Sequence, residues 1–292
     1  MRLKAIIIAL VIQKVAFSQP KFQSNDLTER FAYEVHSIDV FFDRFNFKKN
    51  SVFLDYFIKT NPDWTPNRVI LIKSLFNNES STKSLNNDII ENFILNVTDS
   101  LKPLYLKYRD SGWYADIDCR VMYKGKPGVI KLVMTVERTS KSAYKWSVVS
   151  ADAALLKNKK NRIDSLVTVQ KNELLIGNDS SRYFLSPVSH GINFSNLFKF
   201  FENKQHVRDY LAKGAYSFEL AKLVYLVEHG EVKFIQVNQI TYHLMQLNGW
   251  GMTVTYFEGS PKNSGWLISK LTKLSLEEKN DYLRRKLNIN PN

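Results

Sequence analysis

The chain has 292 residues with a formal net charge of +13, and 44% of its residues are hydrophobic. That apolar content is ample for globular cores, and the length is sufficient for two ordinary domains. A single cysteine, Cys119, excludes an intramolecular disulfide and therefore any small module stapled by disulfides.

The first 18 residues have the three parts of a cleavable secretory signal peptide. Arg2 and Lys4 form a basic start, an eight-residue apolar run follows, and small residues end the segment at Ala16 and Ser18. The apolar run is too short for a membrane-spanning helix. We therefore expect residues 1–18 to be removed and the mature chain, which has no transmembrane segment, to be periplasmic or secreted.

The mature chain should remain strongly basic. Removal of three basic residues with the signal leaves a net charge of +10, which favours anionic lipid headgroups or acidic glycans as partners. Export makes nucleic acid an unexpected binding partner. The tight basic run from Lys157 to Arg162 is interpreted as a solvated linker. Cys119 is interpreted as a buried apolar residue, and its distance from the cleavage site excludes a lipoprotein.

Three helices are predicted in the first half. Asp26 begins a capping box, and an apolar face continues from Phe31 to Phe45 at steps of three and four residues. Pro66 opens the second helix, and Asn87 or Asp88 caps the third.

Alternation of apolar and polar residues then predicts three antiparallel strands. They cover Tyr114–Val121, Ile130–Val136 and Trp146–Ala151, with a turn at 124–128 between the first two.

The second half repeats this order. Helices are predicted around Phe194–Phe201 and His206–Leu211 and from Ser217 to His229. The expected strands are Val232–Leu247, Trp250–Phe257 and Trp266–Leu271, with an Asn-Gly hairpin turn at 248–249. A capped helix from Ser275 to Leu287 follows.

The repetition extends to single residues. Each strand block ends in a strand led by tryptophan, Trp146 or Trp266, with an acidic residue eight or nine positions before it. A period of about 120 residues indicates a duplicated domain. We predict a signal peptide (1–18), a first domain (26–152), a linker with room for short strands (153–190), a second domain (191–274) and a C-terminal helical tail (275–292).

Helices followed by a strongly bent antiparallel meander resemble the nuclear transport factor 2-like superfamily, also called the cystatin-like or cone fold. The segments Phe41–Asn46, Ser186–His190 and Asn263–Ile268 are similar to exported proteins of Bacteroidetes of unassigned function. The resemblance implies an α+β fold with two tandem domains. It implies no single activity, because the superfamily includes isomerase-like and dehydratase-like enzymes, small-ligand binders, adaptors and assembly subunits.

Six residues are candidates for ligand binding in the cone pockets: Tyr114, Asp116, Asp118, Tyr242, His243 and Trp250. A buried carboxylate beside a tyrosine can transfer protons. However, strand alternation places Tyr114 and the two aspartates opposite the apolar face. The favoured interpretation is a polar outer face with cross-strand pairs to Lys131 or Arg120.

Tyr242 and His243 are adjacent on a strand, so only one of them can enter a pocket. The favoured role of His243 is packing. Trp250, just after the hairpin turn, is the candidate for an exposed sugar platform, but a packing role in the core is favoured. The histidines lack metal-ligand spacing, and no phosphate loop or nucleophile elbow occurs. No catalytic residue, metal or cofactor is predicted.

These features favour an exported, non-catalytic binding or adaptor protein of the bacterial cell envelope. Its expected partners are envelope proteins or an acidic glycan or lipid surface. Two alternatives remain open, a small-molecule enzyme of isomerase or hydrolase type that uses a cone pocket, and a structural subunit of an envelope assembly.

Overall fold

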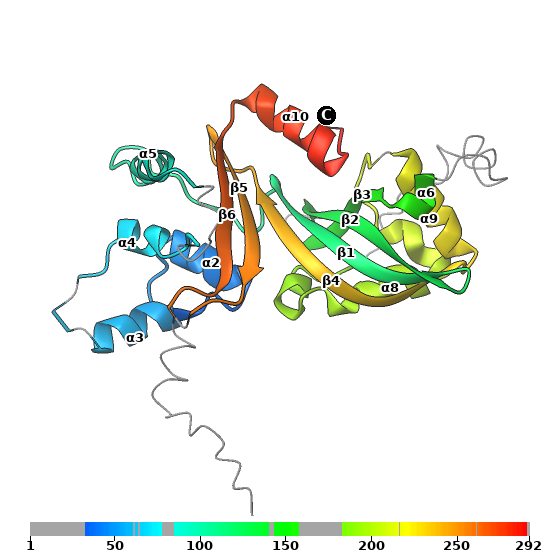
Figure 1. The fold of residues 1–292 in the computed structure, drawn as a ribbon, viewed down its shortest axis with the longest axis horizontal. Coiled ribbons are helices and arrows are strands. Elements are labelled where there is room, and N and C mark those ends of the chain that lie inside the picture. The colour runs from blue at the N-terminus through cyan, green and yellow to red at the C-terminus, as the bar shows by residue number, and fades with distance from the viewer. Residues whose placement is uncertain are drawn as a thin grey trace, which may run out of the picture.

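The computed structural model describes residues 33–60, 62–63, 65–77, 85–139, 143–157, 183–215, 217–260 and 262–290. The predicted signal peptide, the capping box at Asp26 and all but the first residue of the basic run at 157–162 lie outside these ranges. The described chain combines helices with a six-stranded antiparallel sheet (Figure 1), which confirms the α+β class.

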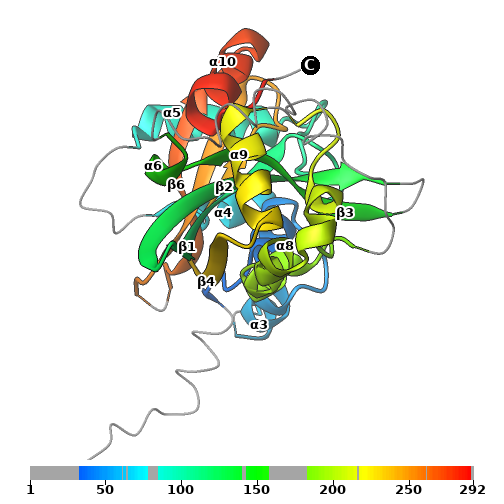
Figure 2. The ribbon, with the colours of Figure 1, turned by 90° about the vertical axis from the view of Figure 1, so that its right-hand side faces the viewer.

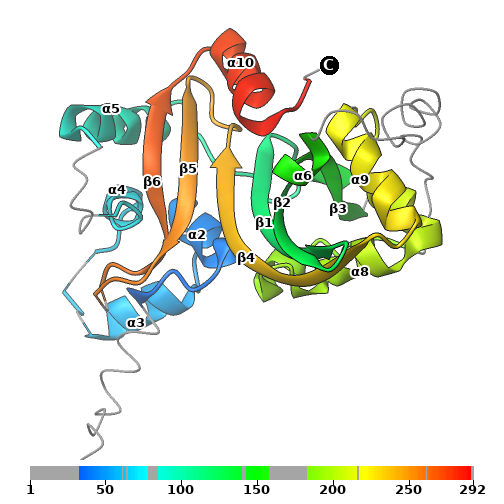
Figure 3. The same cartoon turned by 45° about the vertical axis from the view of Figure 1, so that its right-hand side comes forward.

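The two strand blocks form one sheet. The first block is β1 (Trp113–Tyr123), β2 (Lys126–Arg138) and β3 (Tyr144–Asp152), and the second is β4 (Val232–Leu244), β5 (Trp250–Phe257) and β6 (Gly265–Lys273). The strand order β3-β2-β1-β4-β5-β6 joins the blocks through antiparallel pairing of β1 with β4, the long curved strand in Figure 3. Both predicted domain ranges therefore contribute to one sheet and one main hydrophobic core.

The helices agree with most of the predicted ranges. Those before the sheet are α2 (Ile38–Phe45), α3 (Val52–Thr60), α4 (Arg68–Lys73) and α5 (Asn87–Val97), and those after β3 are α6 (Ala154–Lys157), α8 (Phe198–Glu202) and α9 (Phe218–Glu228). Three 3-10 helices are η1 (Ser189–Ile192), η2 (Ser195–Leu197) and η3 (Lys204–Tyr210). The N-cap at Ser217 is confirmed, whereas the α3 and α6 helices were not predicted.

Each helical block contacts the outermost strand of the other half. Phe76, which follows α4, bridges Ile268 of β6, and Leu211, which follows η3, bridges Val148 of β3. Ile268 and Val148 both stand two residues after their repeated tryptophan, so the two bridges are equivalent. In Figure 1 α2, α4 and α5 gather at β5 and β6, while α9 packs on β3 and α8 on β4 (Figure 2). Equivalent elements of the two halves thus make equivalent contacts, but each helical block contacts the edge strand of the other half.

Gly265 allows the chain before α2 to dock on β6. Val35 accepts a hydrogen bond from the amide of Trp266 (2.8 Å) and donates one to the carbonyl of Ser264 (3.1 Å). Gly265 has φ +90°, and a Cβ added there would overlap the backbone of Val35. Glycine is therefore required here for two reasons: its φ is positive, and a Cβ would not fit against the backbone of Val35.

Replacement of Gly265 by alanine should reveal this contact. Gly125→Ala is a matched control, because Gly125 also has positive φ (+76°) but has open space around its Cβ position. We expect the control to lose about 1 kcal/mol from backbone strain, and Gly265→Ala to lose several times more in urea unfolding. Equal losses would contradict a role for the Val35 contact.

Helix α10 (Leu276–Leu287) packs on the face of the sheet opposite the main hydrophobic core (Figure 1). Ser275 and Glu278 form the predicted capping box, which is confirmed. Leu283 and Leu287 pack with Val133 and Met245 in a second, smaller core. In addition, the ammonium of Lys279 donates hydrogen bonds to the carbonyls of Met245 (2.9 Å) and Leu247.

Two leucines of α10 provide a paired stability test. Leu287 is 1% exposed and Leu276 is 77% exposed. Leu287→Ala should lower the free energy of unfolding by about 2–5 kcal/mol through cavity formation. Leu276→Ala should change it by less than about 0.5 kcal/mol. Thermal and urea unfolding measure both, and similar values would show that α10 is not packed on the sheet.

Candidate functional site

Three of the predicted site residues meet beneath α10. The β1–β4 register places Tyr114 opposite His243 and Asp116 opposite Thr241. Asp116 and His243 are 7% and 2% exposed, and their Oδ2 and Nε2 atoms are 3.7 Å apart. The Nδ1 atom of His243 lies 2.8 Å from the hydroxyl of Tyr282 on α10.

The predicted pair between Asp116 and Lys131 is present, with Nζ 3.2 Å from Oδ2. The expectation of a polar outer face is wrong at this point, because α10 covers it. Asp118 lies farther out, with a side chain 34% exposed and 3.9 Å from Lys131. Burial raises the pKa of Tyr114, and burial together with nearby Asp116 raises the pKa of Tyr282.

Asp116 and His243 are closed off within this cluster, whereas Tyr114 also lines the open cavity described below. The Oδ1 atom of Asp116 and the Nε2 atom of His243 have no hydrogen-bond partner among the described residues. Neither side chain lines any of the grooves described below. Its geometry therefore supports the packing role favoured for His243.

Tyr242 and Trp250 belong to the main core. Tyr242 faces away from His243, as predicted, and packs between Trp113 and Trp266 with ring centres 5.9 and 4.8 Å away. Trp250 is 3% exposed and donates its indole hydrogen to Asn96 (3.1 Å), so the sugar-platform hypothesis at this residue is wrong. Cys119 is fully buried, as predicted, and burial raises the pKa of its thiol.

A second polar cluster surrounds His190, in a segment singled out by the resemblance. Nε2 of its ring lies 3.1 Å from the Asp39 carboxylate, and the Tyr108 hydroxyl contacts the ring nitrogens. The Trp146 indole donates to Pro187 (3.1 Å) and lies 3.3 Å from Nδ1 of His190. The cluster thus ties α2 and η1 to β3.

Burial lowers the pKa of His190 below its ordinary value near 6.5, and Asp39 opposes that shift in part. The unfolded chain therefore binds a proton more readily than the folded one. We expect the free energy of unfolding to fall as the pH drops below about 6.5, with a smaller slope in His190→Gln. Exposed His229 provides the control, and urea unfolding across this range measures the slopes. An unchanged slope in His190→Gln would contradict the assignment.

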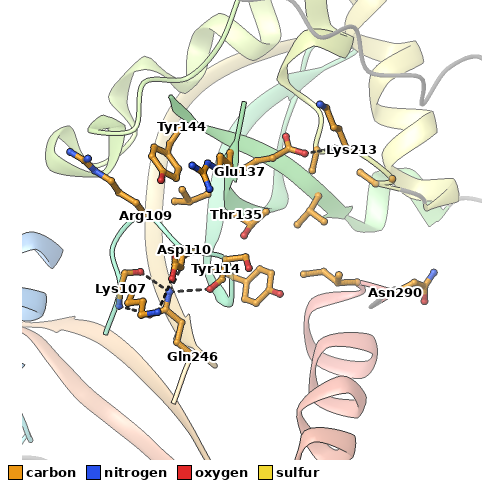
Figure 4. Close-up of a pocket in the computed structure, with 18 of the residues that line it drawn as sticks. Lys107, Arg109, Asp110, Tyr114, Thr135, Glu137, Tyr144, Lys213, Gln246 and Asn290 are labelled. Atoms are coloured by element: carbon orange, nitrogen blue, oxygen red, sulfur yellow. Dashed lines mark hydrogen bonds and ion pairs between the residues drawn. The ribbon is translucent and has the colours of Figure 1, made fainter. Parts of the chain in front are cut away.

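The open cavity in Figure 4 lies at the ends of β2 and β3. It has a volume of about 760 Å³ and is lined by the 105–111 loop, the 212–215 loop, the strand ends and residues 289–290. Four basic side chains line it against two acidic ones: Lys107, Arg109, Arg138 and Lys213, and Asp110 and Glu137. We call this cavity the basic groove.

Gln246 holds the loop that carries Arg109. Its side-chain oxygen accepts from the amide of Lys107 (2.8 Å), and its nitrogen donates to the carbonyls of Lys107 (2.7 Å), Ser111 (3.0 Å) and Asp110 (3.1 Å). Figure 4 shows these bonds converging on Gln246. Through both its amide oxygen and its amide nitrogen, Gln246 thus holds the loop backbone in place.

Tyr144 stands between two arginines at the groove. The guanidinium carbons of Arg109 and Arg138 each lie 5.9 Å from its ring centre, within the range of cation–π attraction. Arg138 and Tyr144 are partners in the β2–β3 register. The arrangement offers guanidinium donors beside an aromatic ring, which suits a carboxylate, sulfate or phosphate group.

The acidic residues of the groove are already engaged. Glu137 accepts hydrogen bonds from the Lys213 amide (2.8 Å) and the Ser147 hydroxyl (2.9 Å). Lys145 lies 4.0 Å from the same carboxylate. Asp110 pairs with Lys107 at 3.3 Å. These contacts offset both negative charges of the groove.

Of the residues that line the basic groove, Tyr114 alone was among the predicted site residues. Arg138 and Tyr144 flank the predicted second hairpin, so their pairing was accessible from strand register. Arg109 lies in a loop without periodicity, and its position depends on contacts with Gln246, 137 residues later. No local pattern carries that information.

Comparisons with known proteins add no family: no protein-family model, curated protein or solved structure matches this chain. Among the described residues, no helix combines the length and apolar character needed to cross a membrane. In the same ranges, no three histidine, cysteine or acidic side chains form a group that could hold a metal ion.

Proposed function

We propose that this chain is an exported, non-catalytic binding protein of the bacterial envelope that holds an anionic ligand in the basic groove. The ligand class is a carboxylated, sulfated or phosphorylated group, as in acidic glycans and lipid headgroups. The observation that carries the proposal is the placement of Arg109 and Arg138 on the Tyr144 ring beside a cavity of about 760 Å³.

Two further features support this function. The net charge of +10 expected after removal of residues 1–18 attracts anions over a longer range, and the groove's two acidic residues each lie beside a lysine. We also retain, as a proposal, a duplication related to the nuclear transport factor 2-like fold. It is supported by the repeated order of elements and by the equivalent bridges of Val148 and Ile268.

Removal of both arginines tests the function. We expect Arg109→Ala/Arg138→Ala to weaken binding to heparin, a soluble polyanion, roughly ten-fold, which corresponds to about 1.4 kcal/mol. Binding of the unaltered chain should weaken as salt increases. Titration with heparin and with phosphatidylglycerol vesicles distinguishes a glycan from a lipid source of the anion.

The control removes the same charge elsewhere. Arg120 and Arg285 are exposed and lie outside the basic groove. Arg120→Ala/Arg285→Ala should weaken binding much less than the groove variant. Equal weakening would reduce the interaction to net charge and overturn the assignment of the groove.

The enzyme alternative is supported by one observation, the buried approach of Asp116 to His243 at 3.7 Å. Proton transfer would require a substrate within hydrogen-bond reach of one of these groups. Helix α10 covers both, and neither lines a described groove. The binding function is therefore the better supported one.

A further inference from the structure

A second cavity runs along β4 where β5 leaves it. β4 pairs with β1 along its whole length but with β5 over Thr241–Leu244. Among the described residues, no strand pairs with the outer edge of β4 before Thr241. A cavity of about 790 Å³ lies beside this edge and shares no residue with the basic groove.

The cavity follows the edge of the strand rather than one face. Seven consecutive residues, Phe234 to Ile240, line it. Side chains of a strand alternate between faces, so a cavity that touches every successive residue must lie alongside the backbone. The outward amides and carbonyls of alternate residues therefore face the cavity, since strand backbone groups point to both sides in turn.

Apolar side chains border the edge. Ile192, Ile235 and Tyr256 are 53%, 42% and 46% exposed, and all three line this cavity. Trp266 stands on the same side as Tyr256, whose ring centre is 5.6 Å away. We call the cavity the strand-edge groove.

The strand-edge groove lacks charge. Its thirteen lining residues include no lysine, arginine, aspartate or glutamate, although 24% of the chain is charged and about three would be expected. Its polar members are amides, hydroxyls and His36. An ionised side chain bound there would lose hydration without gaining a counter-charge. The chemistry therefore selects an uncharged occupant.

We propose that the strand-edge groove binds an uncharged, extended peptide segment of a partner protein, which adds a strand to β4. Main-chain hydrogen bonds to the open edge would supply affinity, and the apolar border would read alternate side chains. Seven strand residues span roughly 23 Å, which sets the length of the recognised segment. Natural sheets protect such edges with charged residues, and no charge occurs from Phe234 to Ile240.

The test uses a library of uncharged octapeptides screened against the purified protein. Selected peptides should lose at least ten-fold in affinity when every second residue is N-methylated, because methylation removes the backbone donors. Ile235→Lys should cause a similar loss by placing a charge at the groove. Leu95→Lys is the matched control, since Leu95 is 71% exposed on α5 and lies outside the groove.

Three outcomes would overturn the proposal. The first is that the library yields no peptide that binds the unaltered protein better than it binds the Ile235→Lys variant. The second is equal binding of methylated and unmethylated peptides. The third is slow hydrogen exchange of the outward amides at 234–240 in the free protein, which would show that the edge is already paired. A dimer in sedimentation that Ile235→Lys disrupts would mean that a second copy of this chain, and not a partner protein, occupies the edge. Loss of heparin binding in the arginine variant leaves these results unaffected.

Discussion

The antiparallel pairing of β1 with β4 is the contact on which the whole architecture depends. It runs from Trp113 opposite Leu244 to Tyr123 opposite Val232 and turns two three-stranded blocks into one sheet. Two register shifts, after Asp118 and after Arg120, interrupt the pairing. Such bulges bend a strand and increase its twist, which allows β4 to curve through the sheet. Because the join is central, the helices of each half reach the edge strand of the other.

The same geometry places the two grooves where regular pairing ends. The basic groove lies beyond the ends of β2 and β3, and the strand-edge groove opens where β5 departs from β4. Their linings differ in chemistry. The basic groove carries arginines around Tyr144, and the strand-edge groove contains no Asp, Glu, Lys or Arg. The chain thus has two separate grooves of different lining chemistry, to which we assign an anion and an uncharged strand as proposed ligands.

Helix α10 explains why the most polar strand positions are not the accessible ones. Tyr114, Asp116 and His243 lie on one face of β1 and β4, as alternation requires, but the helix covers Asp116 and His243, while Tyr114 also lines the basic groove. Its apolar residues Leu283 and Leu287 supply the driving force for this closure. Beneath the helix, Lys131 pairs with one oxygen of Asp116 and Tyr282 hydrogen-bonds one ring nitrogen of His243, while Asp116 Oδ1 and His243 Nε2 have no partner among the described residues.

The sequence by itself determined most of the secondary elements and which strand residues share a face. Period-two alternation identified β1 and β2, the Asn-Gly turn at 248–249 identified the return into β5, and the Ser275–Glu278 box identified α10. Adjacent Tyr242 and His243 were correctly assigned to opposite faces. These features depend on backbone geometry and neighbouring residues. Tertiary structure alone decided that the two strand blocks share one sheet and that α10 covers Asp116. It also brought Arg109 to Tyr144. Each of these results depends on contacts between distant segments, which local periodicity does not encode.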